Sequence, residues 1–212
     1  MKYINETSKI DKNVSIGKNT KIWHWTHISS GSIIGENCTI GQNVFIGNNV
    51  KIGNNVTIND NVVIGDNTII HSNVILGGNG FNYSSDQNDV LHPFPHLGNL
   101  IINDDCEIAS HTFVASGVLD NTIINLGTKI GQFTYIGANV IIGRHCQLRA
   151  RSTIMGSVKI GDKVIIAPGS TIKDYIIIGN NAVIGLGSNV VNNIPKGEVW
   201  FGNPAKKRKN NV

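Results

Sequence analysis

Seven histidines are the side chains of this 212-residue sequence that best suit proton transfer near neutral pH. Packing is the favoured explanation for His24, His27 and His145, while His71 stays open between packing and chemistry. We expect His111 to be the first candidate for a general base and His96 the second. A purely structural role is the alternative at both positions.

A stretch without any repeat joins Leu76 to Ile102, and it reads GGNGFNYSSDQNDVLHPFPHLGNLI. Compact domains seldom carry so long a loop without using it. Because the loop concentrates aromatic side chains and imidazoles, we expect it to cover or line a substrate site. The expected substrate contacts are Phe81, Tyr83, His92 and Phe94. The alternative is an edge flap that caps a neighbouring copy of the chain.

A basic cluster follows the sequence GNPA near the C-terminus. It consists of Lys206, Lys207, Arg208 and Lys209, and it accounts for the whole formal net charge of +4. The rest of the chain is therefore balanced, which argues against a nucleic-acid-binding surface spread over the fold. A local cluster of this kind is suited to phosphate groups.

Composition and cysteine content limit the class of protein. Hydrophobic residues make up 40% of the chain, but no run approaches a membrane span, and the start has no apolar signal segment. Three cysteines are too few and too odd in number for a disulfide framework, and they lack zinc-ligand spacing. We therefore expect a soluble cytoplasmic protein in a reducing compartment.

The elements that must position these residues follow a six-residue period. Isoleucine outnumbers leucine 34 to 8, and there are 29 Asn and 24 Gly, a composition typical of strands and tight corners. Every sixth residue from Ile4 to Leu76 is Ile or Leu. The period resumes at Ile102, skips four residues after Val114, and runs from Ile124 to Val190. A period this long indicates a solenoid.

The other positions of each hexad are also regular. Small or β-branched residues, among them Cys38, Cys106 and Cys146, stand four places after most of the periodic residues, and Asn or Gly usually stands three places after them. Asn and Gly tolerate the left-handed backbone of a tight corner, so each hexad is predicted to be a short strand plus a corner. If the sides are counted in threes, the long loop and the insertion at 115–120 leave from the same corner. Two breaks on one edge predict a local site.

These hexads resemble those of the hexapeptide-repeat acyltransferases over essentially the whole chain. The resemblance implies an all-β fold, a left-handed parallel β-helix shaped as a three-sided prism, in which residue n stacks under residue n+18. Residues 1–195 would form this β-helix, interrupted by one long protruding loop at about 77–101. Residues 196–212 would form a C-terminal extension with the short basic tail.

Three stretches are similar to particular subgroups of this family. IWHWTHISSG resembles N-acetyltransferases of nucleotide-linked amino sugars, GGNGFNY through HLGNLIINDD resembles the UDP-3-O-acylglucosamine N-acyltransferases, and GNPAKKRK resembles the tail of CoA-dependent members. The resemblance implies a homotrimeric N-acyltransferase for a UDP- or dTDP-linked amino sugar in surface polysaccharide or glycolipid synthesis. Acetyl-CoA or another acyl-CoA would be the co-substrate, with no tightly bound cofactor and no metal.

The same resemblance assigns roles around the corner that contains Ala138, where family members carry their catalytic His; a second family His falls on Asp174. The backbone N–H of Gly156 is the expected oxyanion donor. The residues expected to contact CoA are Ala167, Gly185 and Gly187 in a groove, Gly202, Asn203 and Pro204 in the GNPA segment, and Lys206, Lys207 and Arg208 at the phosphates. A neutral amine that needs no side-chain base is a third option beside His111 and His96.

Several alternatives stay open. Transfer to a sugar hydroxyl is the main one, and it would make a base more necessary. A zinc carbonic anhydrase on the same fold needs three converging histidines, and the close pairs here have other spacings. A noncatalytic scaffold is the third alternative. The sequence also leaves open the sugar, the nucleotide, the acyl length, and the choice between CoA and acyl carrier protein.

Overall fold

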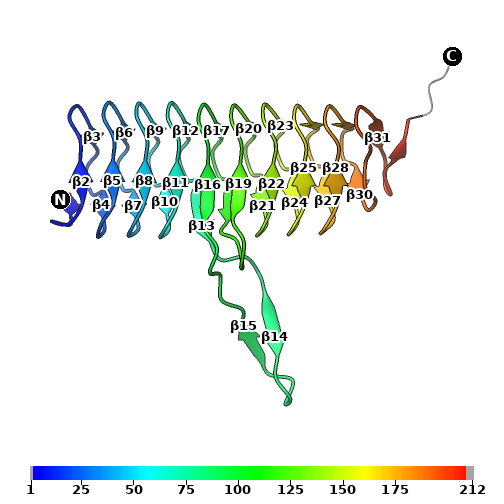
Figure 1. Cartoon of the computed structure of the whole chain (residues 1–212), viewed down its shortest axis with the longest axis horizontal. Coiled ribbons are helices and arrows are strands. Elements are labelled where there is room, and N and C mark those ends of the chain that lie inside the picture. Colours follow the sequence, from blue (N-terminus) through cyan, green and yellow to red (C-terminus); the bar gives the residue numbers. More distant parts are fainter. Residues whose placement is uncertain (1, 209–212) are drawn as a thin grey trace.

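The computed structural model describes residues 2–208 as a straight solenoid from which one hairpin projects (Figure 1). The chain passes through three parallel sheets in turn, so the predicted left-handed parallel β-helix with three sides and a protruding loop is confirmed. No helix that could cross a membrane occurs among these residues.

Within residues 2–208 the short strands fall into three long sheets and one hairpin. Sheet A contains β1 (Tyr3–Ile4), β4 (Lys21–Ile22), β7 (Thr39–Ile40), β10 (Thr57–Ile58), β13 (Ile75–Gly78), β18 (Phe113–Ala115), β21 (Tyr135–Ile136), β24 (Thr153–Ile154), β27 (Thr171–Ile172) and β30 (Asn189–Val190). Sheet B contains β2 (Lys9–Ile10), β5 (His27–Ile28), β8 (Phe45–Ile46), β11 (Val63–Ile64), β16 (Leu100–Ile102), β19 (Thr122–Ile124), β22 (Ile141–Ile142), β25 (Lys159–Ile160) and β28 (Ile177–Ile178). Sheet C contains β3 (Ser15–Ile16), β6 (Ile33–Ile34), β9 (Lys51–Ile52), β12 (Ile69–Ile70), β17 (Glu107–Ile108), β20 (Lys129–Ile130), β23 (Gln147–Leu148), β26 (Ile165–Ile166), β29 (Val183–Ile184), β31 (Val199–Phe201) and β32 (Lys206–Lys207). The hairpin is β14 (Tyr83–Ser85) with β15 (Leu91–Pro93).

The register confirms the predicted 18-residue turn. Ile4 pairs with Ile22, and the pattern continues until Ile64 pairs with Ile102, because the long loop lies between them. Leu76 of β13 pairs with Val114 of β18, so the loop and the insertion do leave from the same corner. No hexad is lost in the loop.

The periodic isoleucines form a continuous interior ladder, and nearly all of them are less than 4% exposed. The small residues beside this ladder also satisfy the backbone, since Thr20 donates to the Gly35 carbonyl at 2.7 Å and Cys146 Sγ lies 3.0 Å from the Gly161 carbonyl oxygen. Burial raises the pKa of the Cys106 thiol to about 11. The cysteines are therefore packing residues, as predicted.

Asn is the residue found most often at the left-handed corners, from φ 54° at Asn43 to φ 63° at Asn73, and other residues such as His111, Phe133 and Tyr175 take the same conformation. Beyond residue 195, β31 continues sheet C beside β29. The chain then turns back, and β32 pairs antiparallel with β31. This returning strand carries the first two cations of the basic tail; Lys209 lies outside the described residues.

Candidate active site

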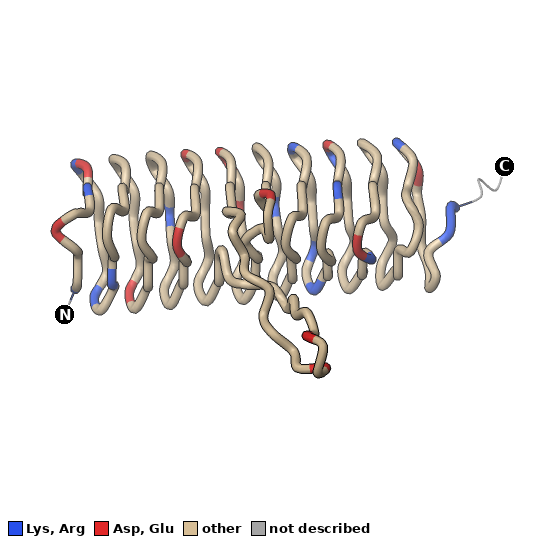
Figure 2. Tube along the Cα trace, turned by 60° about the horizontal axis from the view of Figure 1, so that its bottom comes forward, with Lys and Arg blue, Asp and Glu red and all other residues tan. Residues whose placement is uncertain are grey.

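The long loop and the insertion are joined at their bases. Leu97 N–H donates to the Val118 carbonyl at 2.7 Å, and Asn99 N–H donates to Asn121 Oδ1 at 2.9 Å. Both breaks leave at the AB corner, which we define as the turn from a sheet A strand to the following sheet B strand. Beyond this joined base the loop continues into the projecting hairpin (Figures 1 and 2).

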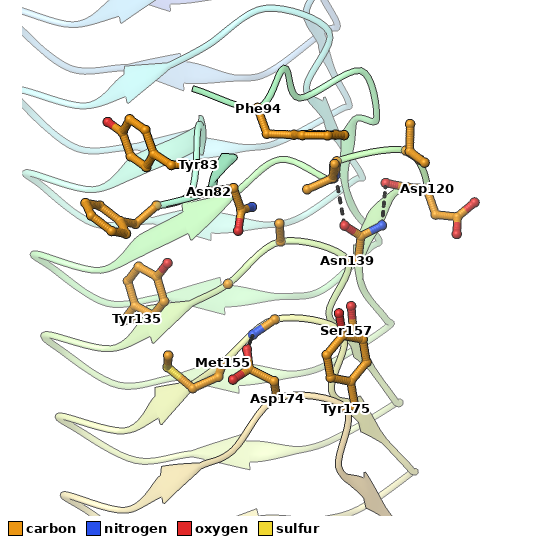
Figure 3. Close-up of a pocket in the computed structure, with 17 residues that line it drawn as sticks. Asn82, Tyr83, Phe94, Asp120, Tyr135, Asn139, Met155, Ser157, Asp174 and Tyr175 are labelled. Atoms are coloured by element: carbon orange, nitrogen blue, oxygen red, sulfur yellow. Dashed lines mark hydrogen bonds between the residues drawn. The ribbon is translucent and has the colours of Figure 1, made fainter. Parts of the chain in front are cut away.

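Asn139, a corner residue of the next coil, holds the insertion in place. Its Oδ1 accepts the N–H of Val118 at 2.9 Å, and its Nδ2 donates to the Asp120 carbonyl at 3.3 Å (Figure 3). Because Asn139 itself adopts φ 61°, an Asn at this position serves both the corner and the insertion.

These parts enclose a cavity of about 540 Å³. Its wall comes from the loop base and the insertion, and its floor comes from the AB corners after β21, β24 and β27. The lining residues are Gly80, Phe81, Asn82, Tyr83, Phe94, Val118, Leu119, Asp120, Tyr135, Gly137, Ala138, Asn139, Met155, Gly156, Ser157, Asp174 and Tyr175. A second hollow of about 410 Å³ shares the loop side chains and adds Phe113. Volumes of this order fit a small ligand.

The floor is a stack of three corners. Ser157 N–H donates to the Ala138 carbonyl at 2.9 Å, and Tyr175 N–H donates to the Gly156 carbonyl at 3.1 Å. Gly156 N–H donates to Asp174 Oδ1 at 3.0 Å. Gly156 therefore lines the cavity, but its N–H, the predicted oxyanion donor, donates to Asp174 and is not free for an oxyanion in this conformation.

Aromatic rings and carboxylates set the character of the cavity. Tyr135 stacks on Phe113 with ring centroids 5.6 Å apart, and Phe81 lies 4.9 Å from Tyr83. Burial, and secondarily the negative charge of Asp174, raise the pKa of the Tyr135 hydroxyl. That hydroxyl therefore stays protonated at neutral pH.

Of the four predicted substrate contacts, Phe81, Tyr83 and Phe94 line the cavity, whereas His92 does not. His92 lies on β15 of the hairpin, where its Nε2 is 3.1 Å from Asp86 Oδ2. This pairing ties one hairpin strand to the turn that follows the other.

Neither predicted base lines the cavity. His96 Nε2 accepts the N–H of Gly80 at 3.0 Å, and its Nδ1 lies 3.2 Å from the Phe94 carbonyl oxygen, so both ring nitrogens hold the loop base. His111 occupies a CA corner, which we define as the turn from a sheet C strand to the following sheet A strand. The CA corners precede the strands of sheet A, whereas the AB corners that line the cavity follow them. The ring of His111 stacks on Phe133 with centroids 4.9 Å apart.

The residues predicted to contact CoA also lie along the CA corners. Ala167, Gly185, Gly187 and Gly202 lie on successive CA corners near the end of the solenoid, and Asn203 and Pro204 follow in the last turn. A side chain added at Gly187 would meet no atom within 4 Å, so this edge is open.

The tail residues have separate environments. Lys207 Nζ lies 2.5 Å from Glu198 Oε1, and Glu198 also accepts the indole N–H of Trp200 at 2.8 Å. Lys206 and Arg208 are exposed, and neither forms an ion pair within the described part of the chain. Two of the three predicted phosphate contacts are therefore available to a ligand.

Sequence reasoning did not assign Tyr135, Asn139, Met155 or Tyr175 to the site. A signal existed, because Ala138, Gly156 and Asp174 are 18 residues apart and must stack, and the other four flank this stack. The hydrogen bonds of Asn139 to the insertion could not be predicted from the sequence, because the insertion does not follow the six-residue period.

The model of one transferase family matches part of the repeats. The family described as "Bacterial transferase hexapeptide (six repeats)" matches residues 13–48, 43–78 and 141–174. The chain is thus similar to the hexapeptide-repeat transferases in its repeats as well as its fold.

Two comparisons define the similarity further. The chain is 34% identical over 131 residues to a UDP-3-O-acylglucosamine N-acyltransferase of Methylobacterium nodulans, a match that covers 62% of this chain and 37% of that protein. Solved structures of UDP-N-acetylglucosamine acyltransferases share the fold. The one from Campylobacter jejuni has a TM-score of 0.66 at 20% identity over 97% of this chain and 74% of that one. The one from Francisella novicida has a TM-score of 0.67 at 22% identity over 99% and 69%.

Proposed function

We propose that this protein is a CoA-dependent N-acyltransferase, with acetyl-CoA as the first donor to test, acting on a nucleotide-linked amino sugar. The observation that carries the proposal is the cavity at the joined base of loop and insertion, which has aromatic walls and a size suited to a sugar. The proposal is supported by the similarity of this chain to a UDP-3-O-acylglucosamine N-acyltransferase, whose name describes N-acyl transfer to a UDP-linked sugar. Buried thiols at all three cysteines fit a cytoplasmic enzyme.

The proposed reaction has simple requirements. The amine nitrogen attacks the thioester carbonyl carbon, the C–S bond breaks, and the proton lost by nitrogen balances the thiol that leaves. The protein must hold the amine and the thioester together, stabilise the oxyanion and exclude water.

The test mixes the protein with acetyl-CoA and a panel of UDP- and dTDP-linked amino sugars and follows thiol release. Release with one of the amines, and none with the matching hydroxyl sugars, is the expected result. If no amine gives thiol release, the proposal is wrong. Single replacement of His111 and of His96 by Asn then tests whether either acts as a base.

We further propose that the active form is a homotrimer. Outward side chains in the middle of sheet B form an unbroken apolar stripe. In contrast, most outward side chains of sheet A are charged or carry a hydroxyl, and in sheet C polar side chains interrupt the aliphatic ones. The stripe consists of Phe45, Val63, Ile101, Ile123 and Ile141. It adjoins the AB corner, so a neighbouring copy packed on it would also border the cavity.

Replacement of Ile123 and Ile141 together by Lys is expected to dissociate the trimer, since two charges would be buried without partners. Light scattering should then give the mass of one chain. Thr39→Lys, on the outer face of sheet A, is the control and should leave the assembly unchanged. A trimer that survives the double replacement would exclude this face as the interface.

We also propose that Lys206 and Arg208 bind the phosphates of CoA. Lys206→Glu with Arg208→Glu is expected to weaken CoA binding at least about tenfold, because hydrogen bonds between charged groups contribute about 1.5–3 kcal/mol each. Lys51→Glu, on β9, is the control for reversal of a charge far from the tail. Calorimetric titration with CoA gives the affinity, and an unchanged melting temperature shows that the solenoid keeps its fold. Equal affinity in all three proteins would contradict the assignment.

A further inference from the structure

The charged groups around the cavity are unusual for a site that is to hold a nucleotide-linked sugar. Within the described part of the chain its lining includes the carboxylates Asp120 and Asp174 but no Lys, Arg or His. A diphosphate placed here would meet negative charge without compensation. A positively charged group of the ligand would be attracted.

The two carboxylates differ in position. Asp174 lies on the floor beside Gly156, whereas Asp120 lies at the rim, on the insertion, and is exposed (Figure 3). The backbone N–H of Gly156 fixes Asp174 Oδ1. No hydrogen bond in the described structure reaches Asp174 Oδ2, so this oxygen keeps its capacity to accept one from a ligand.

We propose that Asp174 binds the acceptor amine of the sugar, with Oδ2 accepting a hydrogen bond from the ammonium group. The inference rests on the proposed function and names the group that selects its substrate. Ala138, Gly156 and Asp174 all line the cavity, and Gly156 lies between the other two.

The neighbouring hydroxyl supports this arrangement. The pKa of Tyr135 is raised by burial and then by the charge of Asp174, so this phenol adds no second negative charge and keeps a proton to donate. The other titratable groups that line the cavity are Tyr83, Asp120 and Tyr175. None of them carries a positive charge that could neutralise Asp174.

Two consequences follow for the substrate. An amine is preferred over a hydroxyl at the same carbon, because only the protonated amine carries a positive charge that pairs with the carboxylate of Asp174, whereas a hydroxyl donates a hydrogen bond without that charge. The diphosphate lies outside the acidic floor, so this cavity holds the sugar end of the molecule. The bound ammonium must release one proton before its nitrogen attacks the thioester, and water at the rim can accept it.

The test measures binding of UDP-glucosamine and UDP-glucose, which differ by an amine or a hydroxyl at one carbon. At pH 6, where the amine is protonated, wild type is expected to bind the amine at least about tenfold more tightly. Asp174→Asn should lose this preference, while its amide oxygen still accepts the Gly156 N–H and preserves the fold. At pH 9 the preference of wild type should shrink, because the amine is then largely neutral.

Asp120→Asn is the matched control, since it removes one carboxylate from the rim of the same cavity, and it should keep the preference. If Asp174→Asn prefers the amine as strongly as wild type does, the inference is wrong while the proposed function stands. If wild type binds neither sugar and releases no thiol with any amine, the proposed function fails and the inference fails with it. Thermal unfolding of each variant shows whether a loss of preference reflects a loss of fold.

Discussion

Gly156→Leu is expected to reduce acyl transfer by about a hundredfold or more without unfolding the protein. A β-carbon at Gly156 would lie 3.4 Å from Asp174 Oδ1 and 3.5 Å from the Ala138 carbonyl oxygen, both ordinary contacts. The backbone therefore tolerates a side chain here. A leucine would occupy the floor of the cavity and displace the sugar from the thioester, and a displacement of about 1 Å already costs about a hundredfold in rate.

Two alanine variants separate the effect on the cavity from an effect on the fold. Gly156→Ala should fold and keep most of its activity, because one methyl group fits. Gly137→Ala should destabilise the protein, since its β-carbon would lie 2.9 Å from Gly156 N and 3.0 Å from the Met155 carbonyl carbon. Thiol release and thermal unfolding should be measured on all three proteins. A fully active Gly156→Leu variant would show that catalysis occurs elsewhere on the solenoid.

The solenoid itself could be predicted because each hexad repeats the same physical solution. An inward Ile, a small neighbour and a corner residue recur, so one hexad defines the next. The three-sided closure was implied by the resemblance to the hexapeptide-repeat acyltransferases, and with it the register follows from counting. The same counting placed the long loop and the insertion at one corner. It also brought Ala138, Gly156 and Asp174 into one stack.

The two histidines predicted as bases, His111 and His96, lie away from the cavity for different reasons. His111 follows Ile108, a sheet C residue, so its corner differs from the one that follows Val114, and the sequence already contained this information. His96 is a different case. Its contacts with Gly80 and Phe94 lie inside the loop, where no period exists and only the folded chain defines neighbours.

The basic tail is a second place where the sequence predicts a function but not the contacts of each residue. Four adjacent cations predict phosphate binding but not which of them are free. The return of β32 along β31 places Lys207 against Glu198 and leaves Lys206 exposed, because neighbouring residues of a strand face opposite sides. That return depends on the turn at 202–205, which has no counterpart among the hexads.

Excision of the projecting hairpin is expected to abolish most acyl transfer while the solenoid keeps its stability. In the designed variant two glycines replace Tyr83–Pro95 and join Asn82 to His96. The ends are close enough to join, because Phe94 N–H donates to the Asn82 carbonyl at 2.9 Å. Every residue from 83 to 95 is exposed, so the core loses nothing. The cavity, however, loses the Tyr83 and Phe94 part of its wall and opens to water, which weakens the electrostatic interactions inside it.

A shorter excision separates the wall from the rest of the hairpin. Replacing residues 86–90 by Asn-Gly removes the turn and the Asp86–His92 contact but keeps Tyr83 and Phe94 in place. This variant should keep nearly the activity of wild type if the hairpin acts only through its base. Activity lost equally in both variants would instead locate the function of the hairpin at its tip, where it could reach a neighbouring copy. The comparison therefore decides between the two explanations that the sequence left open for this loop, a wall of the substrate site or a flap that caps another chain.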